Sequence, residues 1–194
     1  MNFLAHIYLS GDDPQIKIGN FIADSVKGKQ FIHFPKGIQK GIILHRAIDT
    51  FTDIHPTVRK GVRRLFPTYS HYSTVIIDIL YDHFLAANWK EYSLIPLDKY
   101  VADFYDLLNQ NIEVLPIPIR QFLPIMIRDN WLLKYATVPG IGEILAQMNH
   151  RTGNKSQMNL AVRELELYYS AFEQEFKSFF EDMQHFALEK ISKL

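Results

Sequence analysis

Residues 41–56 read Gly-Ile-Ile-Leu-His-Arg-Ala-Ile-Asp-Thr-Phe-Thr-Asp-Ile-His-Pro, and this stretch decides how the rest of the chain is interpreted. His45, Asp49 and Asp53 are spaced four residues apart, so on a helix they form one polar stripe. Apolar residues lie beside and behind the stripe. A surface helix ordinarily carries Lys and Glu on its polar face, whereas His and Asp bind divalent metals and transfer protons. The pattern therefore predicts a helix that contributes part of a metal-centred hydrolytic site.

A second apolar stretch, residues 70–90, repeats the same residue types. Asp78 and Asp82 are again four residues apart, and His83 follows directly. Two carboxylates one turn apart repel each other unless a positive group lies between them. We therefore expect the two helices to share one metal site. The alternative is that each His is a core residue with satisfied hydrogen bonds and that the Asp residues face water.

The first 27 residues add two further candidates. His6 lies in a short apolar helix predicted over residues 2–10, and Asp24 lies among apolar residues in a helix predicted over 14–27. A carboxylate on so apolar a surface needs a partner, because burying it alone is very costly. A metal ion is one such partner; a buried Arg or a helix N-terminus are the others.

Composition and hydrophobic periodicity predict the fold class. The chain has 194 residues, 47% of them hydrophobic, and no Cys, which excludes disulfides, thiolate zinc sites and Cys nucleophiles. Alternation typical of strands is not sustained anywhere, and further helices are expected over 97–110, 116–135, 141–150 and 158–190. We predict an all-α fold, a single compact multi-helix domain over residues 1–194. The start lacks a basic leader and no apolar run reaches the length of a membrane span, so we expect a soluble, cytoplasmic protein.

Charge is unevenly distributed along the chain. Residues 1–64 hold ten Lys and Arg against five Asp, although the whole chain has no formal net charge. This excess favours an anionic partner near the predicted site over ordinary charge scatter. Four basic residues follow Pro56 on a predicted amphipathic helix, and we expect them to form the docking surface: Arg59, Lys60, Arg63 and Arg64. The alternatives are a membrane-surface element or a solvated helix face.

Several familiar catalytic and cofactor-binding motifs are absent from the sequence. The chain instead resembles one known family. The chain has no phosphate-binding loop, no dinucleotide fingerprint, no His-Glu-x-x-His motif, no paired Glu-x-x-His helices and no Gly-x-Ser-x-Gly elbow. The chain resembles the acyl carrier protein phosphodiesterases, also called holo-acyl-carrier-protein hydrolases. The segments that carry the resemblance are Met1–His6, Gly19–Asp24, Leu44–Asp49 through His55-Pro56, and Tyr81–Leu85 with Trp89.

The resemblance implies a fold, a reaction and a cofactor. These enzymes are a divergent branch of the HD-domain metal phosphohydrolases, so an HD-like architecture and a divalent ion, manganese or else magnesium, are expected. The implied reaction removes 4′-phosphopantetheine from the serine of holo-acyl carrier protein, an acidic protein, and involves no nucleic acid. The chain departs from the wider superfamily because it contains no His-Asp dipeptide; the nearest pair is the reversed Asp82-His83.

Each candidate residue receives a role from this chemistry. We assign five residues to the metal and its immediate surroundings: Asp24, His45, Asp49, Asp82 and His83. We assign four to acid–base catalysis or to orienting the ligands: His6, Asp53, His55 and Asp78. Arg46 is expected either to hold a phosphate oxygen or to form a surface salt bridge. Two other functions remain open: an HD-like phosphohydrolase acting on a nucleotide or another small phosphoester, and a non-catalytic helical protein with a structural metal.

Overall fold

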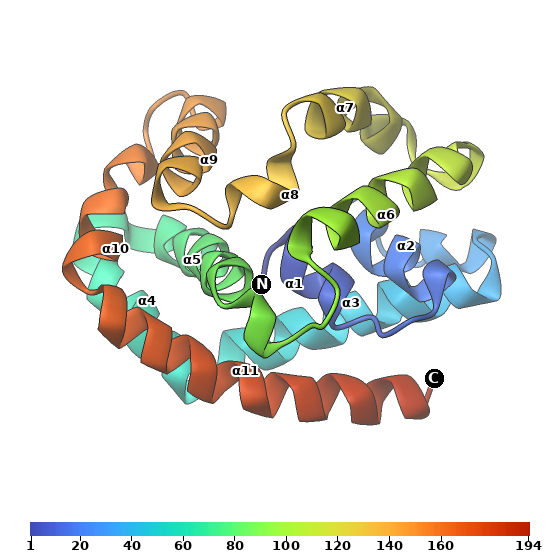
Figure 1. Ribbon diagram of the computed structural model, residues 1–194, viewed down its shortest axis with the longest axis horizontal. Coiled ribbons are helices and arrows are strands. Elements are labelled where there is room, and N and C mark those ends of the chain that lie inside the picture. The colour runs from blue at the N-terminus through green and yellow to red at the C-terminus, as the bar shows by residue number, and fades with distance from the viewer.

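The computed structural model describes residues 1–194 and contains helices but no strand, which confirms the all-α prediction (Figure 1). The eleven α-helices are α1 (Phe3–Tyr8), α2 (Pro14–Ile22), α3 (Lys36–Ile54), α4 (Pro56–Tyr69), α5 (Ser73–Ala87), α6 (Leu97–Gln110), α7 (Ile117–Arg128), α8 (Trp131–Lys134), α9 (Val138–Arg151), α10 (Val162–Leu167) and α11 (Tyr169–Ser192). No helix combines the length and the apolar character that crossing a membrane requires.

Helix starts follow from local sequence signals. The Asp13 carboxylate caps α2 by accepting hydrogen bonds from the backbone N–H groups of Gln15 and Ile16, and Pro14 occupies the first helical position. Pro56 likewise opens α4 directly after α3 ends, so the chain changes direction there without a loop. Thr137 caps α9 through the N–H of Gly140. The predicted helix starts at Pro14 and Pro56 are therefore confirmed, whereas α9 begins three residues before the expected 141, so Pro139 and Gly140 lie in its first turn.

Two long predicted helices are each divided. The segment expected over 116–135 breaks at Asn130, whose backbone is left-handed with φ of 46°, and α8 starts afresh after it. Asn adopts the left-handed conformation more readily than most residues do, but a single Asn in an apolar segment did not predict a helix break. The segment expected over 158–190 forms α10 and α11, which meet at Tyr168. The helix expected over 14–27 ends at Ile22.

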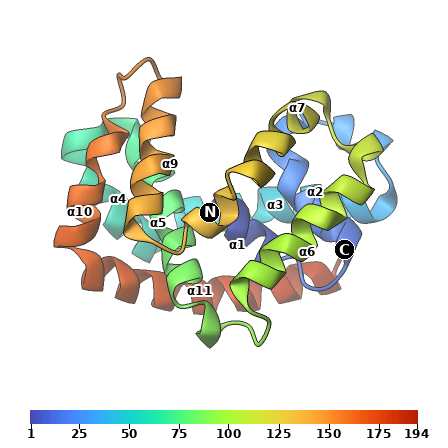
Figure 2. The ribbon, with the colours of Figure 1, turned by 45° about the horizontal axis from the view of Figure 1, so that its top comes forward.

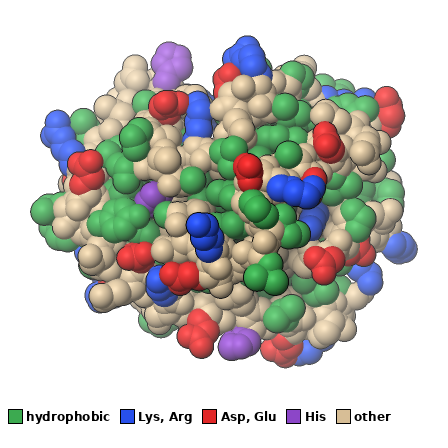
Figure 3. Space-filling view, viewed as in Figure 1, with side chains coloured by type: hydrophobic (Ala, Val, Ile, Leu, Met, Phe, Trp, Pro, Cys, Tyr) green, Lys and Arg blue, Asp and Glu red, His purple; other side chains and the backbone are tan.

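One hydrophobic core of 48 buried residues runs from Met1 to Ala187. Helix α5 lies at its centre and packs against α1, α4, α9 and α11, so most of its length is buried. Helix α11 runs along one side of the molecule, beside α3, α4 and α5 (Figures 1 and 2). Acidic and basic side chains alternate over the face shown in Figure 3, without a large patch of one sign.

Helices α2 and α3 approach each other so closely that their backbones touch. A Cβ atom added at Gly19 would lie 2.1 Å from the carbonyl oxygen of Ile38, and one at Gly41 would lie 2.2 Å from the carbonyl oxygen of Ile16. Only glycine fits at either position, because the obstacle is backbone and cannot rotate away. This crossing places the middle of α2 against the first turns of α3.

Replacing Gly19 tests the importance of this contact. We expect Gly19→Ala to lower the free energy of unfolding by about 3 kcal/mol, because the new methyl group forces the two backbones apart. Urea unfolding followed by circular dichroism measures the change.

Gly142→Ala is the matched control for this variant. A Cβ atom there would meet only Val162 Cγ2 at 3.5 Å, so the gain in helix propensity should leave the protein equally or more stable. Equal stability of Gly19→Ala and the wild type would contradict the proposed role of the crossing.

Candidate metal centre

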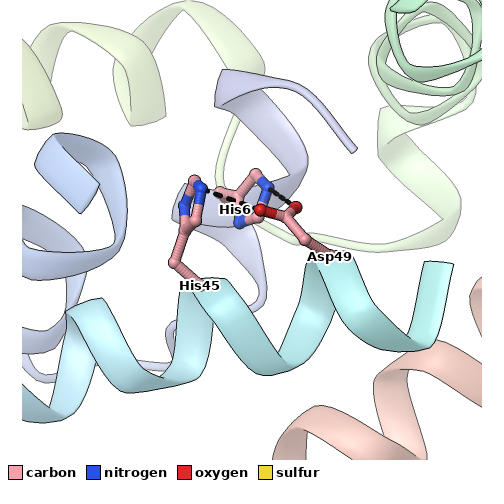
Figure 4. Close-up of side chains that lie close together, drawn as sticks. All are labelled: His6, His45 and Asp49. Carbon is pink, nitrogen blue, oxygen red and sulfur yellow. Dashed lines mark ion pairs between the residues drawn. The ribbon is translucent and has the colours of Figure 1, made fainter. Parts of the chain in front are cut away.

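Three side chains converge where α1 meets α3. His45 and Asp49 extend from successive turns of α3, and His6 reaches them from α1 (Figure 4). The Asp49 carboxylate contacts both imidazoles at their Nε2 atoms, with Oδ1 3.2 Å from His6 Nε2 and Oδ2 3.1 Å from His45 Nε2. The two rings stack with their centroids 4.0 Å apart. The predicted pairing of His45 with Asp49 on one stripe is present, and the tertiary fold adds His6.

Asn20, on α2, fixes the orientation of both imidazoles. His45 Nδ1 lies 2.7 Å from the Asn20 carbonyl oxygen, which only accepts, so Nδ1 carries the proton. His6 Nδ1 lies 2.8 Å from Asn20 Oδ1 and donates to it. The amide nitrogen of Asn20 fixes which way the group points, because Nδ2 donates to the His6 carbonyl at 2.8 Å and to Ser10 Oγ at 2.9 Å. Each ring therefore directs Nε2 toward Asp49.

These donor atoms fit a divalent cation. His6 Nε2 is buried and makes no well-aligned hydrogen bond, although Asp49 Oδ1 is 3.2 Å away. A neutral imidazole with its proton on Nδ1 presents a lone pair to the carboxylate, and two acceptors that face each other require a positive group between them. Adjacent ligands of an octahedral ion with bonds of ~2.1 Å lie about 3 Å apart, close to the spacing seen here. His6, His45 and Asp49 are the residues that could hold the ion.

Burial and mutual contact set the charges of this cluster. Burial, reinforced by the nearby His45, lowers the pKa of His6 to about 4, so His6 is neutral. Burial alone would also lower the pKa of His45, but its hydrogen bonds to Asp24 and Asp49 outweigh burial and raise that pKa to about 9. The same contacts lower the pKa of Asp49, against the effect of burial. Without a cation, the proton on His45 supplies the positive charge.

Asp24 lies at the rim of the cluster. Its Oδ1 is 3.2 Å from His45 Nε2, and the hydrogen bond from His45 lowers the Asp24 pKa. Its side chain is 79% exposed, against 41% for Asp49, so it is the more accessible carboxylate to a ligand arriving from solvent. The structure therefore places Asp24 beside the centre, in contact with one of the three convergent residues.

Asp82 and His83 do not join the cluster. The Asp82 carboxylate is fully buried and accepts hydrogen bonds from the backbone N–H groups of Asn2, Leu4 and Ala5, so it caps the first turn of α1. Burial raises its pKa to about 7, although these N–H groups oppose the shift. His83 Nδ1 donates to the Tyr135 carbonyl at 2.7 Å, and Nε2 is 3.0 Å from the Tyr169 hydroxyl. The structure thus does not bring these two side chains to the cluster on α3, because they hold other elements in place.

The remaining catalytic candidates are scattered. Asp78 Oδ1 lies 2.9 Å from the amino group of Met1, near the start of α1. His55 joins α3 to α4 and lies 3.2 Å from Asp182 on α11. Asp53 is exposed at the end of α3. Arg46 donates to the Val26 carbonyl at 2.9 Å and covers the Phe31 ring, so it holds the segment that follows α2.

The predicted docking residues on α4 differ in their environments. Arg64 makes a bidentate ion pair with the buried Glu175 of α11, with distances of 2.7 and 2.8 Å, and Lys60 lies 3.3 Å from the same carboxylate. Arg59 donates to the Asp53 carbonyl. Arg63 is exposed and has no such partner. Arg64 therefore ties α4 to α11, because burial of Glu175 requires a cation beside it.

Comparison with known proteins identifies the family. The family model described as acyl carrier protein phosphodiesterase matches residues 1–183. The chain belongs to this family. The predicted resemblance and the prediction of an enzyme are thereby confirmed.

Relatives named acyl carrier protein phosphodiesterase match over nearly their whole length. The protein from Photorhabdus laumondii is 28% identical over 98% of this chain and 96% of the relative. The protein from Yersinia enterocolitica is 30% identical over 98% of this chain and 99% of the relative. No solved structure matches the chain.

Asn20 is the functional residue that sequence reasoning missed. It lies in the Gly19–Asp24 segment that carried the family resemblance, but an amide on an apolar helix gave no indication of a role. We expect Asn20→Leu to weaken Mn²⁺ binding by about 10- to 100-fold, because His6 Nδ1 then loses its acceptor, whereas His45 Nδ1 keeps the backbone carbonyl of residue 20. Isothermal titration measures the affinity.

Asn149→Leu is the matched control for Asn20→Leu. Asn149 is also buried and hydrogen-bonded, but to Asn154 and Ser156 rather than to the cluster. Both variants lose a buried amide, so a loss of affinity confined to Asn20→Leu assigns the effect to the metal centre. Equal affinities in the two variants would show that Asn20 does not orient the ligands.

The pH dependence of metal affinity tests the charge on His45. An ordinary His would make affinity fall only below about pH 6.5. In this protein the cation must displace a proton whose pKa is about 9, so affinity should fall by up to ~10-fold for each pH unit below that value. Mn²⁺ titrations at about pH 7 and about pH 8.5 measure the difference. Equal affinities at the two values would argue that His45 does not bind the ion.

Proposed function

We propose that this chain hydrolyses the phosphodiester that joins 4′-phosphopantetheine to the serine of holo-acyl carrier protein, releasing the apo protein. The observation that carries the proposal is the convergence of His6, His45 and Asp49, in which the neutral His6 Nε2 faces a carboxylate oxygen 3.2 Å away. A site that could hold a divalent cation agrees with phosphodiester hydrolysis, and the family name suggests the substrate. The HD-like architecture and the cytoplasmic location are parts of the proposal that rest on the resemblance and on composition.

The residues of the centre have distinct tasks in this proposal. His6, His45 and Asp49 would hold the ion, which is manganese or magnesium. When bound, the ion acidifies water and offsets negative charge on the phosphoryl oxygens. Asp24 is ionised because its pKa is lowered, and it is exposed, so its free oxygen can accept a proton from the attacking water. Asn20 keeps both Nε2 atoms directed at the centre.

The proposed partner is an acidic carrier protein, and the exposed basic residues of α4 are the proposed docking surface. Arg64 and Lys60 share the single negative charge of Glu175, so together they contribute one net positive charge rather than two. Arg59 and Arg63 remain exposed on α4. Rim charges of this kind act mainly on the rate of encounter, so their contribution should weaken as salt increases.

Mass spectrometry of holo-acyl carrier protein tests the proposal. We expect the metal-loaded protein to convert the holo form to the apo form, with 4′-phosphopantetheine as the other product. His6→Ala should reduce kcat at least about 100-fold, because the centre loses one of its three convergent donors.

His71→Ala is the control, since His71 is exposed and lies outside the cluster. It should retain wild-type turnover. Hydrolysis of bis-p-nitrophenyl phosphate with the holo form left intact would favour a phosphohydrolase for small phosphoesters. Metal binding without hydrolysis of either compound would indicate a structural metal.

A further inference from the structure

A cavity of about 330 Å³ opens beside the metal centre. It is enclosed by the start of the chain, α5, α8 and α9, and Figures 1 and 2 show the N-terminus beside α5 and α8. Asp24 connects the cavity to the candidate metal centre, because it lines the cavity and its Oδ1 lies 3.2 Å from His45 Nε2. A ligand in this cavity therefore has one end against the candidate metal centre.

Helix α9 supplies one wall of the cavity through a single face. Ile144, Gln147, Met148 and Arg151 line it, and their spacing of three and four residues places them on one stripe. Phe3 and Val75 extend the apolar surface on the other side. Apolar walls with a few polar groups are typical of small-molecule sites, and the volume is at the small end of their range.

The polar groups of the cavity include amides and one cation without an anionic partner. Gln147 and Asn2 carry the amides; Gln147 can both donate and accept, whereas Asn2 Oδ1 already accepts from the Phe3 N–H, so Asn2 offers its NH₂ group as a donor. The Arg151 guanidinium lies over the Trp131 ring, 5.8 Å from its centroid, and forms no ion pair. Phe122 also stacks on this indole, so the ring is already packed and is poorly placed to receive a nucleotide base.

We propose that this cavity binds the pantetheine arm of the substrate. The proposal rests on the proposed function, which places the phosphate at the metal centre. Pantetheine is a narrow chain with a dimethyl carbon, a hydroxyl and two amides; the dimethyl carbon fits the apolar walls, and the amides fit Gln147 and Asn2. Binding the arm away from the reacting atoms would align the phosphodiester with the centre. Selectivity for a pantetheine-bearing diester over other diesters then arises at α9.

Blocking the cavity tests the inference. Gln147 is exposed on α9, so Gln147→Trp should fold while its indole fills the cavity. We expect the ratio of kcat/KM for holo-acyl carrier protein to kcat/KM for bis-p-nitrophenyl phosphate to fall at least about tenfold, because only the first substrate has the arm. His150→Trp is the matched control, since His150 is exposed on the same helix and does not line this cavity. Its ratio should stay at the wild-type value.

A binding measurement on the wild type makes the test independent of any variant. Pantetheine itself, which has no phosphate, should shift the methyl resonances of Ile144 and Met148 in the Mg²⁺-loaded protein, where no paramagnetic ion broadens them. An unchanged ratio in Gln147→Trp, or shifts that appear elsewhere in the protein, would overturn the inference even if the wild type hydrolyses holo-acyl carrier protein. Failure of that hydrolysis, with the Ile144 and Met148 shifts present, would overturn the proposed function and leave the cavity assignment supported. Failure of both would overturn both.

Discussion

The close contact of α2 with α3 is the constraint on which the candidate site depends. Gly19 and Gly41 let the backbones touch, and no side chain other than hydrogen fits at either position. The contact places the carbonyl and the amide of Asn20 within hydrogen-bond distance of His45 Nδ1. A separation larger by one methyl group would break these hydrogen bonds, and His45 would lose its fixed orientation. Backbone packing and the geometry of the candidate metal centre are therefore linked through two glycines.

A second contact holds the other half of the centre. His6 belongs to α1, which has only six residues and is too short to be stable alone. Asp82 compensates by accepting three backbone N–H groups at the start of α1, and Asn20 contacts both the ring and the carbonyl of His6 from α2. The Asp82 carboxylate on α5 thus supports the candidate site indirectly, because it fixes the start of α1 and α1 carries His6.

The two Asp-and-His helices show why the same pattern leads to different outcomes. On α3, the stripe faces α1 and α2, which supply an imidazole and an amide. On α5, Asp82 faces the N–H groups of α1, while His83 faces a carbonyl and a hydroxyl. Each buried polar group takes the nearest partner that satisfies it, because leaving it unsatisfied is costly. A sequence shows the groups that need partners, but their partners depend on which helices are adjacent.

The sequence by itself determined the helical class, most helix starts, the family, and the His45–Asp49 pair. These depend on local periodicity, on capping residues and on spacing along one helix, all of which are short-range. The tertiary structure alone decided that His6 completes the centre, that Asn20 orients it, that Asp82 caps α1, and that Arg64 neutralises Glu175. Each of these contacts joins residues of different helices, and Arg64 is 111 positions from Glu175 along the chain. The packing of helices sets such distances, and no local pattern records them.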